Sequence, residues 1–357
     1  MKVTYVYADD SAAWNSANWR CAIPAEALNA TRRHSAELCS IQDFKEGNQV
    51  CEYRCKDADV IVVQRHLTPD AWHAVQHWRE AGKLLLIDID DGYLQLRPDN
   101  PAYSFWFEGM ARQPDGRLVR LPERPIDKFV EGVKQFDGLT SPNRLICADF
   151  EALGIRTAYV PNWAPTRLYL DAPRAAHDRP RILWGGSMSH VAAWLESGIL
   201  YALAREITKR PQVEFAVCGA DQRVADMIPL KATQKVVIGW APFRRWPEVI
   251  KTADIGLAPM VGEYDARRSW IKPLEFSLCQ LPWLGSESGA YTEYAGYGTL
   301  VPNTPEAWAQ ALAEALDQPP DAGRVRRAQH WAKAQDIADH LDEMCNLYAG
   351  IKKGGAA

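Results

Sequence analysis

The residues best suited to chemistry lie in the stretch 253–297, where a short apolar run is followed by a cluster of cations. Residues 255–260 are typical of a buried strand, because parallel strands covered on both faces form continuous apolar runs. Arg268 and Lys272 follow in a polar loop, and Pro273 begins an amphipathic segment. Proline favours the first turn of a helix, where backbone N–H groups also attract an anion. The stretch therefore predicts a site for a polyanion.

A second group of chemical residues is acidic and ends the strongest apolar run of the first half, residues 83–89. Strand alternation puts Asp88 and Asp90 on one side, with Asp91 in the following loop. Acids gathered at a strand end are costly without a function or a counter-charge. Three interpretations stay open: a carboxylate that deprotonates or orients a hydroxyl group, a divalent-metal site, and a solvated turn.

The elements that must position these residues alternate between short apolar runs and helical segments, which is typical of βα units on a parallel sheet. A length of 357 residues suits two domains, and the Pro- and Ala-rich stretch 164–180 reads as their linker. Residues 104–128 interrupt the alternation and are rich in Arg and aromatic residues. We expect an insertion there, with a hairpin turning at Asp115-Gly116. The expected strands are 3–7, 36–41, 60–64, 83–89, 136–140, 157–160, 181–184, 213–218, 236–238, 255–260 and 281–284.

The order of a strand, a basic loop, Lys-x-x-Glu on a helix, a strand and a Gly/Ser loop with Tyr-x-Glu resembles the donor half of GT-B glycosyltransferases of the GT4-like group. Asp-Ile-Asp-Asp followed by Asn-Pro-Ala-Tyr, and the later Val-Pro-Asn, extend the resemblance over most of the chain. It implies an α/β GT-B fold, with two Rossmann-like doubly wound domains facing across a cleft and a C-terminal helix that crosses back to the first domain. The implied boundaries are 1–165 for the acceptor-side domain, with an insertion at about 98–128, 180–325 for the nucleotide-sugar-binding domain, and 326–357 for the C-terminal helix and tail.

The resemblance also implies roles for single residues. Lys272 would contact the donor diphosphate and Glu275 the ribose hydroxyls, and we count both as catalytic together with Asp90 and Asp91. The family often carries another glutamate eight positions before the first; this position is Arg267, so the stereochemical outcome stays open. The remaining donor-binding candidates are Gly185, Gly186, Ser187, His190, Trp240, Arg268, Ser288 and Gly289. Of these, the amides of Gly186, Ser288 and Gly289 are expected to stabilise the leaving diphosphate.

Acceptor contacts are expected from the loop after the first strand, because loops at the carboxyl ends of strands line the crevice of an open α/β sheet. The candidates are Asp9, Asp10, Trp14, Asn15 and Trp19.

The predicted function is transfer of a sugar from a nucleotide-diphosphate sugar to a hydroxyl acceptor, an enzyme of the EC 2.4 type. UDP-sugars are favoured over GDP-sugars as donor. The acceptor is a glycan or, as in phage-type enzymes, a hydroxymethylated base in DNA. Two alternatives remain: a non-catalytic module that binds nucleotide-sugar or nucleic acid, and another GT-B-like enzyme such as a sugar-nucleotide epimerase.

Composition limits the partners and the compartment. A net charge of −4 gives no global attraction to nucleic acid or to an anionic membrane. The eight cysteines include no Cys-x-x-Cys, and Cys51 with Cys55 has no second pair at zinc-site spacing. Without a signal peptide or an apolar run of the roughly 18 residues that a membrane span needs, we expect a cytoplasmic protein. No metal requirement and no permanently bound cofactor are expected, and the oligomeric state stays open.

Overall fold

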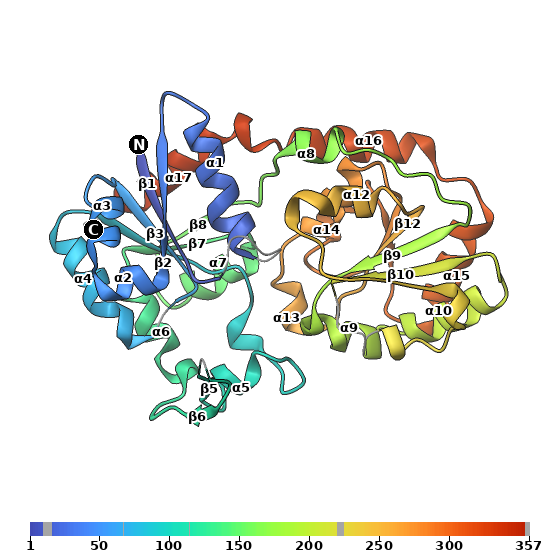
Figure 1. Cartoon of the computed structure of the whole chain (residues 1–357), viewed down its shortest axis with the longest axis horizontal. Helices are drawn as coiled ribbons and strands as arrows, with labels where there is room; N and C mark the ends of the chain where they lie inside the picture. The colour runs from blue at the N-terminus through green and yellow to red at the C-terminus, as the bar shows by residue number, and fades with distance from the viewer. Residues whose placement is uncertain (10–15, 67, 114, 220–224, 354–357) are drawn as a thin grey trace.

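The structure is a computed structural model that describes residues 1–9, 16–66, 68–113, 115–219 and 225–353. It contains two α/β domains, each built on a six-stranded parallel sheet (Figure 1). The strand orders are β2-β1-β3-β4-β7-β8 and β11-β10-β9-β12-β13-β14. This arrangement confirms the predicted GT-B fold class, including the helix that returns to the first domain.

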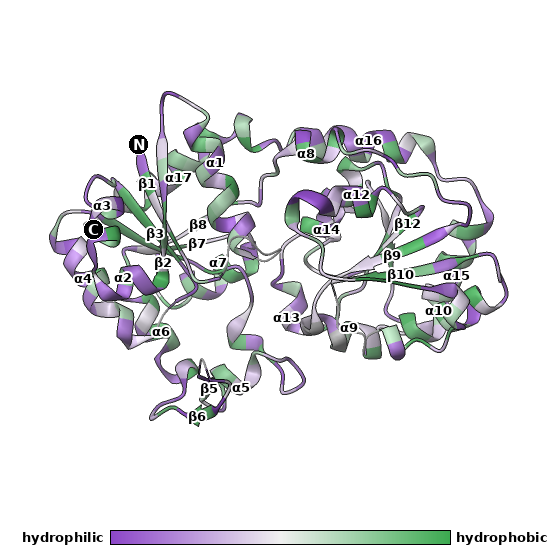
Figure 2. Ribbon diagram, viewed as in Figure 1, coloured by the Kyte–Doolittle hydropathy of each residue, from purple (hydrophilic) through white to green (hydrophobic). Residues whose placement is uncertain are grey.

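The first sheet consists of strands that lie within a residue or two of the apolar runs predicted from the sequence. Its central strands β3 and β4 are buried at every position, which explains the apolar run of four residues with which each begins (Figure 2). The strands are β1 (Lys2–Tyr7), β2 (Ser35–Ser40), β3 (Val60–Gln64), β4 (Leu84–Asp88), β7 (Gly138–Ser141) and β8 (Thr157–Tyr159). The helices are α1 (Ile23–Asn29), α2 (Ile41–Glu46), α3 (Gln49–Cys55), α4 (Trp72–Glu80), α6 (Phe129–Val133) and α7 (Arg144–Glu151).

The second sheet is also six-stranded and parallel, but its strands lie in the chain order 3-2-1-4-5-6, whereas those of the first sheet lie in the order 2-1-3-4-5-6. It includes one strand, β14, that the sequence did not predict. Its strands are β9 (Arg181–Gly185), β10 (Glu214–Cys218), β11 (Lys235–Ile238), β12 (Ile255–Ala258), β13 (Trp283–Ser286) and β14 (Thr299–Val301). The helices are α9 (Val191–Glu196), α10 (Ile199–Thr208), α12 (Trp246–Ile250), α13 (Gly262–Ala266), α14 (Ile271–Leu278) and α15 (Pro305–Asp317).

The C-terminal helical segment is broken, whereas the sequence predicts a single C-terminal helix with a tail over 326–357. Helix α16 (Ala322–Lys333) lies along the second domain, and α17 (Leu341–Lys353) lies on the first (Figure 1). Between them the backbone pairs with the segment that joins the domains: Ala164 N donates to Gln335 O, and Ile337 N donates to Ala164 O, both at 2.9 Å. These long-range bonds compete with helical ones, so the break falls where the chain crosses between domains.

Two segments outside the sheets bear on the cleft. The expected linker contains a short helix, α8 (Thr166–Leu170), whose Tyr169 is fully buried in the second domain. The predicted insertion forms α5 (Tyr103–Trp106) and the antiparallel hairpin of β5 (Met110–Arg112) and β6 (Leu118–Arg120), which projects from the first domain (Figure 1). Gly116, with φ of 85°, lies in the connection between the two strands.

The apolar core continues from one domain into the other. Trp19 of the first domain meets Phe243 of the second edge-on, with ring centroids 5.6 Å apart, and both belong to one buried cluster. No helix in the described part of the chain has the length and apolar character needed to cross a bilayer.

The docking of α17 onto the first sheet leaves no room beside β7. A Cβ at Gly138 would lie 2.6 Å from Ile351 Cγ2 and 2.9 Å from the backbone oxygen of Arg156. We expect Gly138→Ala to lower the free energy of unfolding by about 1–3 kcal/mol, measured by urea denaturation. The matched control is Gly350→Ala on an open face of α17, which should be neutral or stabilise by up to about 1 kcal/mol. Equal effects of the two changes would contradict this account of the helix docking.

Candidate functional site

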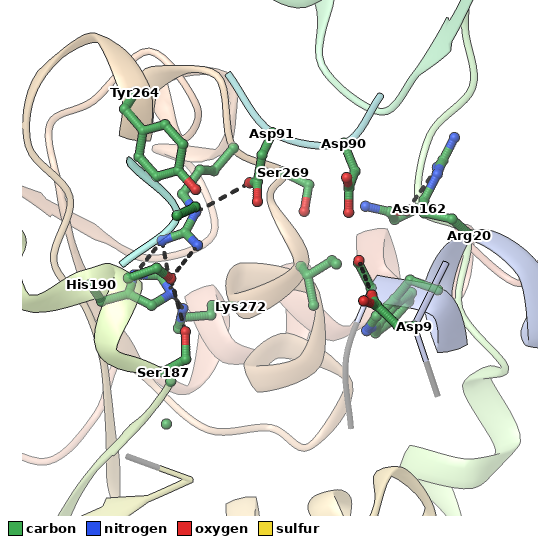
Figure 3. Close-up of a pocket in the computed structure, with 18 of the residues that line it drawn as sticks. Asp9, Arg20, Asp90, Asp91, Asn162, Ser187, His190, Tyr264, Ser269 and Lys272 are labelled. Atoms are coloured by element: carbon green, nitrogen blue, oxygen red, sulfur yellow. Dashed lines mark hydrogen bonds and ion pairs between the residues drawn. The ribbon is translucent and has the colours of Figure 1, made fainter. Parts of the chain in front are cut away.

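A cavity of about 540 Å³ lies between the domains, at the carboxyl ends of both sheets. Parallel sheets bind ligands at this edge, because the loops that follow the strands converge there. Figure 3 shows Arg20, Asp90 and Asn162 on one side of it, with His190 and Lys272 on the other. The lining residues are Asp9, Ser16, Trp19, Arg20, Arg65, Asp90, Asp91, Tyr93, Asn100, Pro101, Ala102, Asn162, Gly185, Gly186, Ser187, Ser189, His190, Trp240, Trp246, Met260, Tyr264, Arg268, Ser269, Ile271, Lys272 and Glu275.

The wall from the second domain carries two cations joined by one imidazole. Arg268 Nη1 lies 2.9 Å from Nδ1 and 3.0 Å from Nε2 of His190, and Lys272 Nζ lies 3.2 Å from Nε2. Burial, together with the charges of Arg268 and Lys272, holds the pKa of His190 well below its ordinary value, so the ring is neutral. Because both cations can only donate, Nε2 is the acceptor of this neutral ring. His190 thus holds the two cations side by side.

The positive charge of this wall is only partly balanced by carboxylates. Arg268 Nε lies 3.5 Å from Asp91 Oδ1, and its Nη1 lies 3.5 Å from Asp265 Oδ1. Burial and the repulsion of Arg268 lower the pKa of Lys272 to about 8. A depressed lysine pKa means that this environment disfavours its charge, so a bound anion would be attracted to the wall.

Glu275, one turn beyond Lys272 on α14, is a buried carboxyl group. It is 1% exposed, and Tyr169 donates its hydroxyl to Oε1 at 2.8 Å. Burial raises the pKa of Glu275 to about 7, against the opposing effects of Trp246, Tyr169 and Lys272. The carboxylate can accept hydrogen bonds from ligand hydroxyl groups when it is ionised.

The first domain contributes a buried ion pair that the sequence reasoning did not find. Arg20 grips Asp88 with two hydrogen bonds of 2.8 and 2.7 Å. Its Nη1 also donates to Val160 O at 2.9 Å and to Asn162 Oδ1 at 2.8 Å. Burial opposes the charge of Arg20, but Asp88 outweighs it and raises the Arg20 pKa. Asp88 therefore has a structural role: its pair with Arg20 fixes the loops at the end of β4.

The side chains of Asp88, Asp90 and Asp91 have different partners. Asp88 turns to Arg20, and Asp91 turns to Arg268 across the cavity. Asp90 stays in the cavity, 9% exposed, with the Tyr93 hydroxyl 3.5 Å from Oδ1. Burial and the neighbouring Asp91 raise the pKa of Asp90 to about 6. Of the three, Asp90 combines cavity access with a pKa suited to accepting a proton near neutrality.

Arg65 was also missed, although it lies between the cavity and the rest of the first domain. Its φ of 40° is unusual for a residue other than glycine, and such backbone strain gathers at functional sites. The side chain pairs with Asp9 and donates to Tyr93 Oη at 3.4 Å. Arg65 follows Gln64, the last residue of β3, and its position after a buried strand was the available signal.

Two of the glycines predicted to approach a ligand serve packing. A Cβ at Gly185 would lie 2.3 Å from the Trp246 ring, and one at Gly186 would lie 2.8 Å from Trp184. The N–H of Gly186 donates to Cys218 O at 3.1 Å. This amide thus already has a backbone partner, and its stabilisation of a diphosphate stays a prediction.

The structure gathers most of the other predicted donor-site residues. Ser187, His190, Trp240, Arg268, Lys272 and Glu275 line the cavity with Gly185 and Gly186. Trp240 is 47% exposed, so a ring could stack on it. Ser288 and Gly289 are not part of the lining. Ser288 lies behind Met260, with its Oγ 4.0 Å from the sulfur atom.

The predicted acceptor residues divide into three kinds. Asp9 lines the cavity as the partner of Arg65. Trp19 also lines it, but it is 5% exposed because it packs against Phe243. Asp10, Trp14 and Asn15 lie outside the described residues.

Arg267, at the position where the family often has glutamate, points to the other domain. Its Nε donates to Asp149 of α7 at 2.5 Å, and its Nη1 donates to Glu263 at 2.6 Å. Asn143 Nδ2 also crosses between domains, donating to the backbone oxygens of Ala266 and Arg268 at 3.0 and 2.9 Å. These contacts fix the loop that carries Arg268.

Comparison with known proteins agrees with this fold. A family model described as "Glycosyl transferases group 1" matches residues 179–318, which include the whole second sheet. No curated protein sequence matches the chain at a significant level.

Several solved structures share the fold at low sequence identity. HepE of Anabaena in complex with UDP has a TM-score of 0.66 and 14% identity, covering 98% of this chain and 100% of its own. A glycosyltransferase of Rickettsia africae has a TM-score of 0.64 and 12% identity, covering 99% and 98%. A protein of Listeria monocytogenes assigned as a UDP-N-acetylglucosamine 2-epimerase has a TM-score of 0.53 and 14% identity, covering 92% and 90%. The family match and the shared fold confirm the resemblance to GT-B glycosyltransferases of the GT4-like group and support sugar transfer.

The contributions of Arg20 and Asp88, the buried ion pair beside the cavity, to stability should be strongly coupled. We expect Arg20→Met to lower the free energy of unfolding by about 3–5 kcal/mol, because it leaves the Asp88 carboxylate buried without its counter-charge. The double variant Arg20→Met/Asp88→Leu should cost clearly less than the sum of the two single changes. Equilibrium urea unfolding measures all three.

The control is Arg33→Met, which removes an exposed pair with Asp342 and should cost less than about 1 kcal/mol. Additive single effects at Arg20 and Asp88 would show that the pair does not act as a unit.

Proposed function

We propose that the protein transfers a sugar from a UDP-sugar to a hydroxyl group of an acceptor, with the donor diphosphate bound by Lys272 and Arg268 of the second domain. The observation that carries the proposal is the pair of buried, incompletely balanced cations facing Asp90 across one cavity. An anion of two or more charges would offset their repulsion. The preference for UDP rests on the complexes of structural neighbours such as HepE.

The remaining contacts to the donor follow from the cavity wall. Glu275 would accept hydrogen bonds from the ribose hydroxyls, and exposed Trp240 would stack on the base. As the bond between the sugar carbon and the diphosphate oxygen breaks, negative charge grows on the leaving UDP. Lys272 and Arg268, already in place, would stabilise that charge without reorganisation. This arrangement can act without a metal ion, so we propose metal-independent transfer.

Asp90 is the proposed general base. As the acceptor oxygen bonds to the sugar carbon, its proton passes to the Asp90 carboxylate. Asp91 is the less suitable candidate because it lies 3.5 Å from Arg268 and balances its charge. Its role would be to hold the cation wall against the first domain when the cleft is closed.

For the acceptor, a glycan hydroxyl is better supported than a DNA base. The arginines of the insertion are partly engaged within it: Arg124 donates to Asp127 at 2.7 Å, and Arg112 donates to Gly116 O at 3.0 Å. A DNA acceptor would make binding fall steeply with salt, whereas a small glycan would not. The epimerase alternative rests on a shared fold; it would need no acceptor hydroxyl.

The donor site can be tested by binding alone. We expect UDP to raise the melting temperature of the wild-type protein equally in EDTA and in Mg²⁺. Lys272→Ala should weaken UDP binding by roughly 10- to 100-fold, because a charged hydrogen bond contributes about 1.5–3 kcal/mol. Calorimetric titration measures the change. Lys209→Ala, at the exposed residue that follows α10, is the control and should bind as the wild type does. Loss of binding in both variants would count against the assignment.

The base can be tested by the pH dependence of transfer. Asp90 must be ionised to accept a proton, so kcat/KM should fall as the pH drops below about 6. Lys272 must be charged, so kcat/KM should also fall as the pH rises above about 8. Protonation of Glu275, whose pKa is about 7, would begin a shallower fall below pH 7, and the fall would become steeper below about 6. Transfer from a UDP-sugar panel, followed as released UDP, measures the profile.

Asp90→Asn should lower kcat by roughly 10²- to 10⁴-fold while UDP binding is retained. Asp115→Asn, in the projecting hairpin, should leave both unchanged. A variant Asp90→Asn with wild-type kcat would exclude Asp90 as the base.

A further inference from the structure

Three of the eight cysteines lie close together in the first domain and are not part of the lining of the interdomain cavity. Cys39 comes from the end of β2, and Cys51 and Cys55 come from one face of α3. Their sulfur atoms all lie within 4.8 Å of one another, and those of Cys51 and Cys55 are 3.9 Å apart. An ion held at about 2.3 Å from thiolate sulfurs keeps those sulfurs about 3.8 Å apart in tetrahedral geometry and about 4.0 Å apart in trigonal geometry. The Cys51–Cys55 distance is therefore that of two ligands of one ion, and Cys39 lies close enough to be a third.

The surroundings decide how many ligands the set can offer. All three cysteines are 0% exposed, within an apolar cluster that includes Phe44 and Trp78. In the described part of the chain, this trio is the only group of three or more His, Cys, Asp or Glu side chains so placed, and no fourth such ligand joins it. A tetrahedral ion would need a fourth ligand from solvent, which burial opposes.

We propose that Cys39, Cys51 and Cys55 form a three-sulfur binding site for a soft ion of low coordination number, Cu(I). Soft thiolate ligands select Cu(I), and three of them suffice for trigonal coordination. The ion would replace thiol protons, so its affinity rises with pH. It would also link β2 to α3 and stabilise the first domain by binding only the folded state.

The test is a titration of the fully reduced, metal-free protein with Cu(I), without oxygen, in competition with a chromogenic Cu(I) chelator. We expect one equivalent bound, with thiolate-to-copper charge-transfer absorption. Cys39→Ser and Cys55→Ser should each weaken binding by roughly 100-fold or more. The control is Cys147→Ser, a buried single thiol of the same domain, which should bind as the wild type does. Equal loss in the control, or Cu(I) bound with no dependence on Cys39 and Cys55, would overturn the proposal.

X-ray absorption at the copper edge tests the wild type directly, in case the serine variants fail to fold. Three sulfur neighbours at about 2.3 Å support the site; nitrogen or oxygen neighbours contradict it. A parallel titration with Zn²⁺ examines the coordination number. One equivalent of Zn²⁺ bound more tightly than Cu(I) through the same cysteines would overturn the choice of a three-coordinate soft ion.

Discussion

The site depends on the free-energy cost of keeping two cations, Arg268 and Lys272, charged side by side in a buried wall. Neutral His190 accepts from both cations, and Asp91 and Asp265 supply part of the compensating charge. Burial and the charge of Arg268 nevertheless lower the pKa of Lys272, so this environment disfavours its charge. A bound diphosphate would offset both positive charges. The unfavourable free energy of holding these two cations side by side would then favour binding of the donor.

The opposite wall meets a different constraint, because its acids must be kept from repelling one another. Asp88 is neutralised by Arg20 inside the first domain, and Asp91 is turned toward Arg268 in the second. Asp90 is left in the cavity with its proton affinity raised by burial and by Asp91. Each of the three neighbouring acids thus has a different environment: Asp88 is in a buried pair, Asp91 contacts the other domain, and Asp90 faces the cavity.

The relation of the two walls is maintained by contacts around the cavity. Asn143 and Arg267 tie the Arg268 loop to α7 of the first domain. Arg97 donates to Glu196 of α9 at 2.8 Å on another side. Because these residues lie far apart in the sequence, the geometry of the cavity is a property of the docked domains rather than of either one.

Sequence reasoning found the parts of this molecule that local patterns encode. Apolar runs located eleven of the twelve strands of the two sheets, and Lys-x-x-Glu on α14 marked Lys272 and Glu275. It missed Arg20 and Arg65, because their roles come from partners 68 and 56 positions away, Asp88 and Asp9 respectively.

The same limit explains the other differences. The break between α16 and α17 depends on pairing with Ala164, and a local periodicity cannot reveal it. The thiol cluster could not be recognised from the spacing of the cysteines in the sequence. Cys39 comes close to Cys51 and Cys55 only when β2 packs against α3.

The central claim is that a nucleotide diphosphate completes the charge balance of the wall built from Arg268 and Lys272, opposite Asp90. The most direct measurement is a crystal structure of the protein with bound UDP. The account predicts the diphosphate within hydrogen-bond distance of Lys272 and Arg268, the ribose on Glu275 and the base beside Trp240. UDP bound away from both cations, or with its diphosphate turned to the first domain, would contradict it.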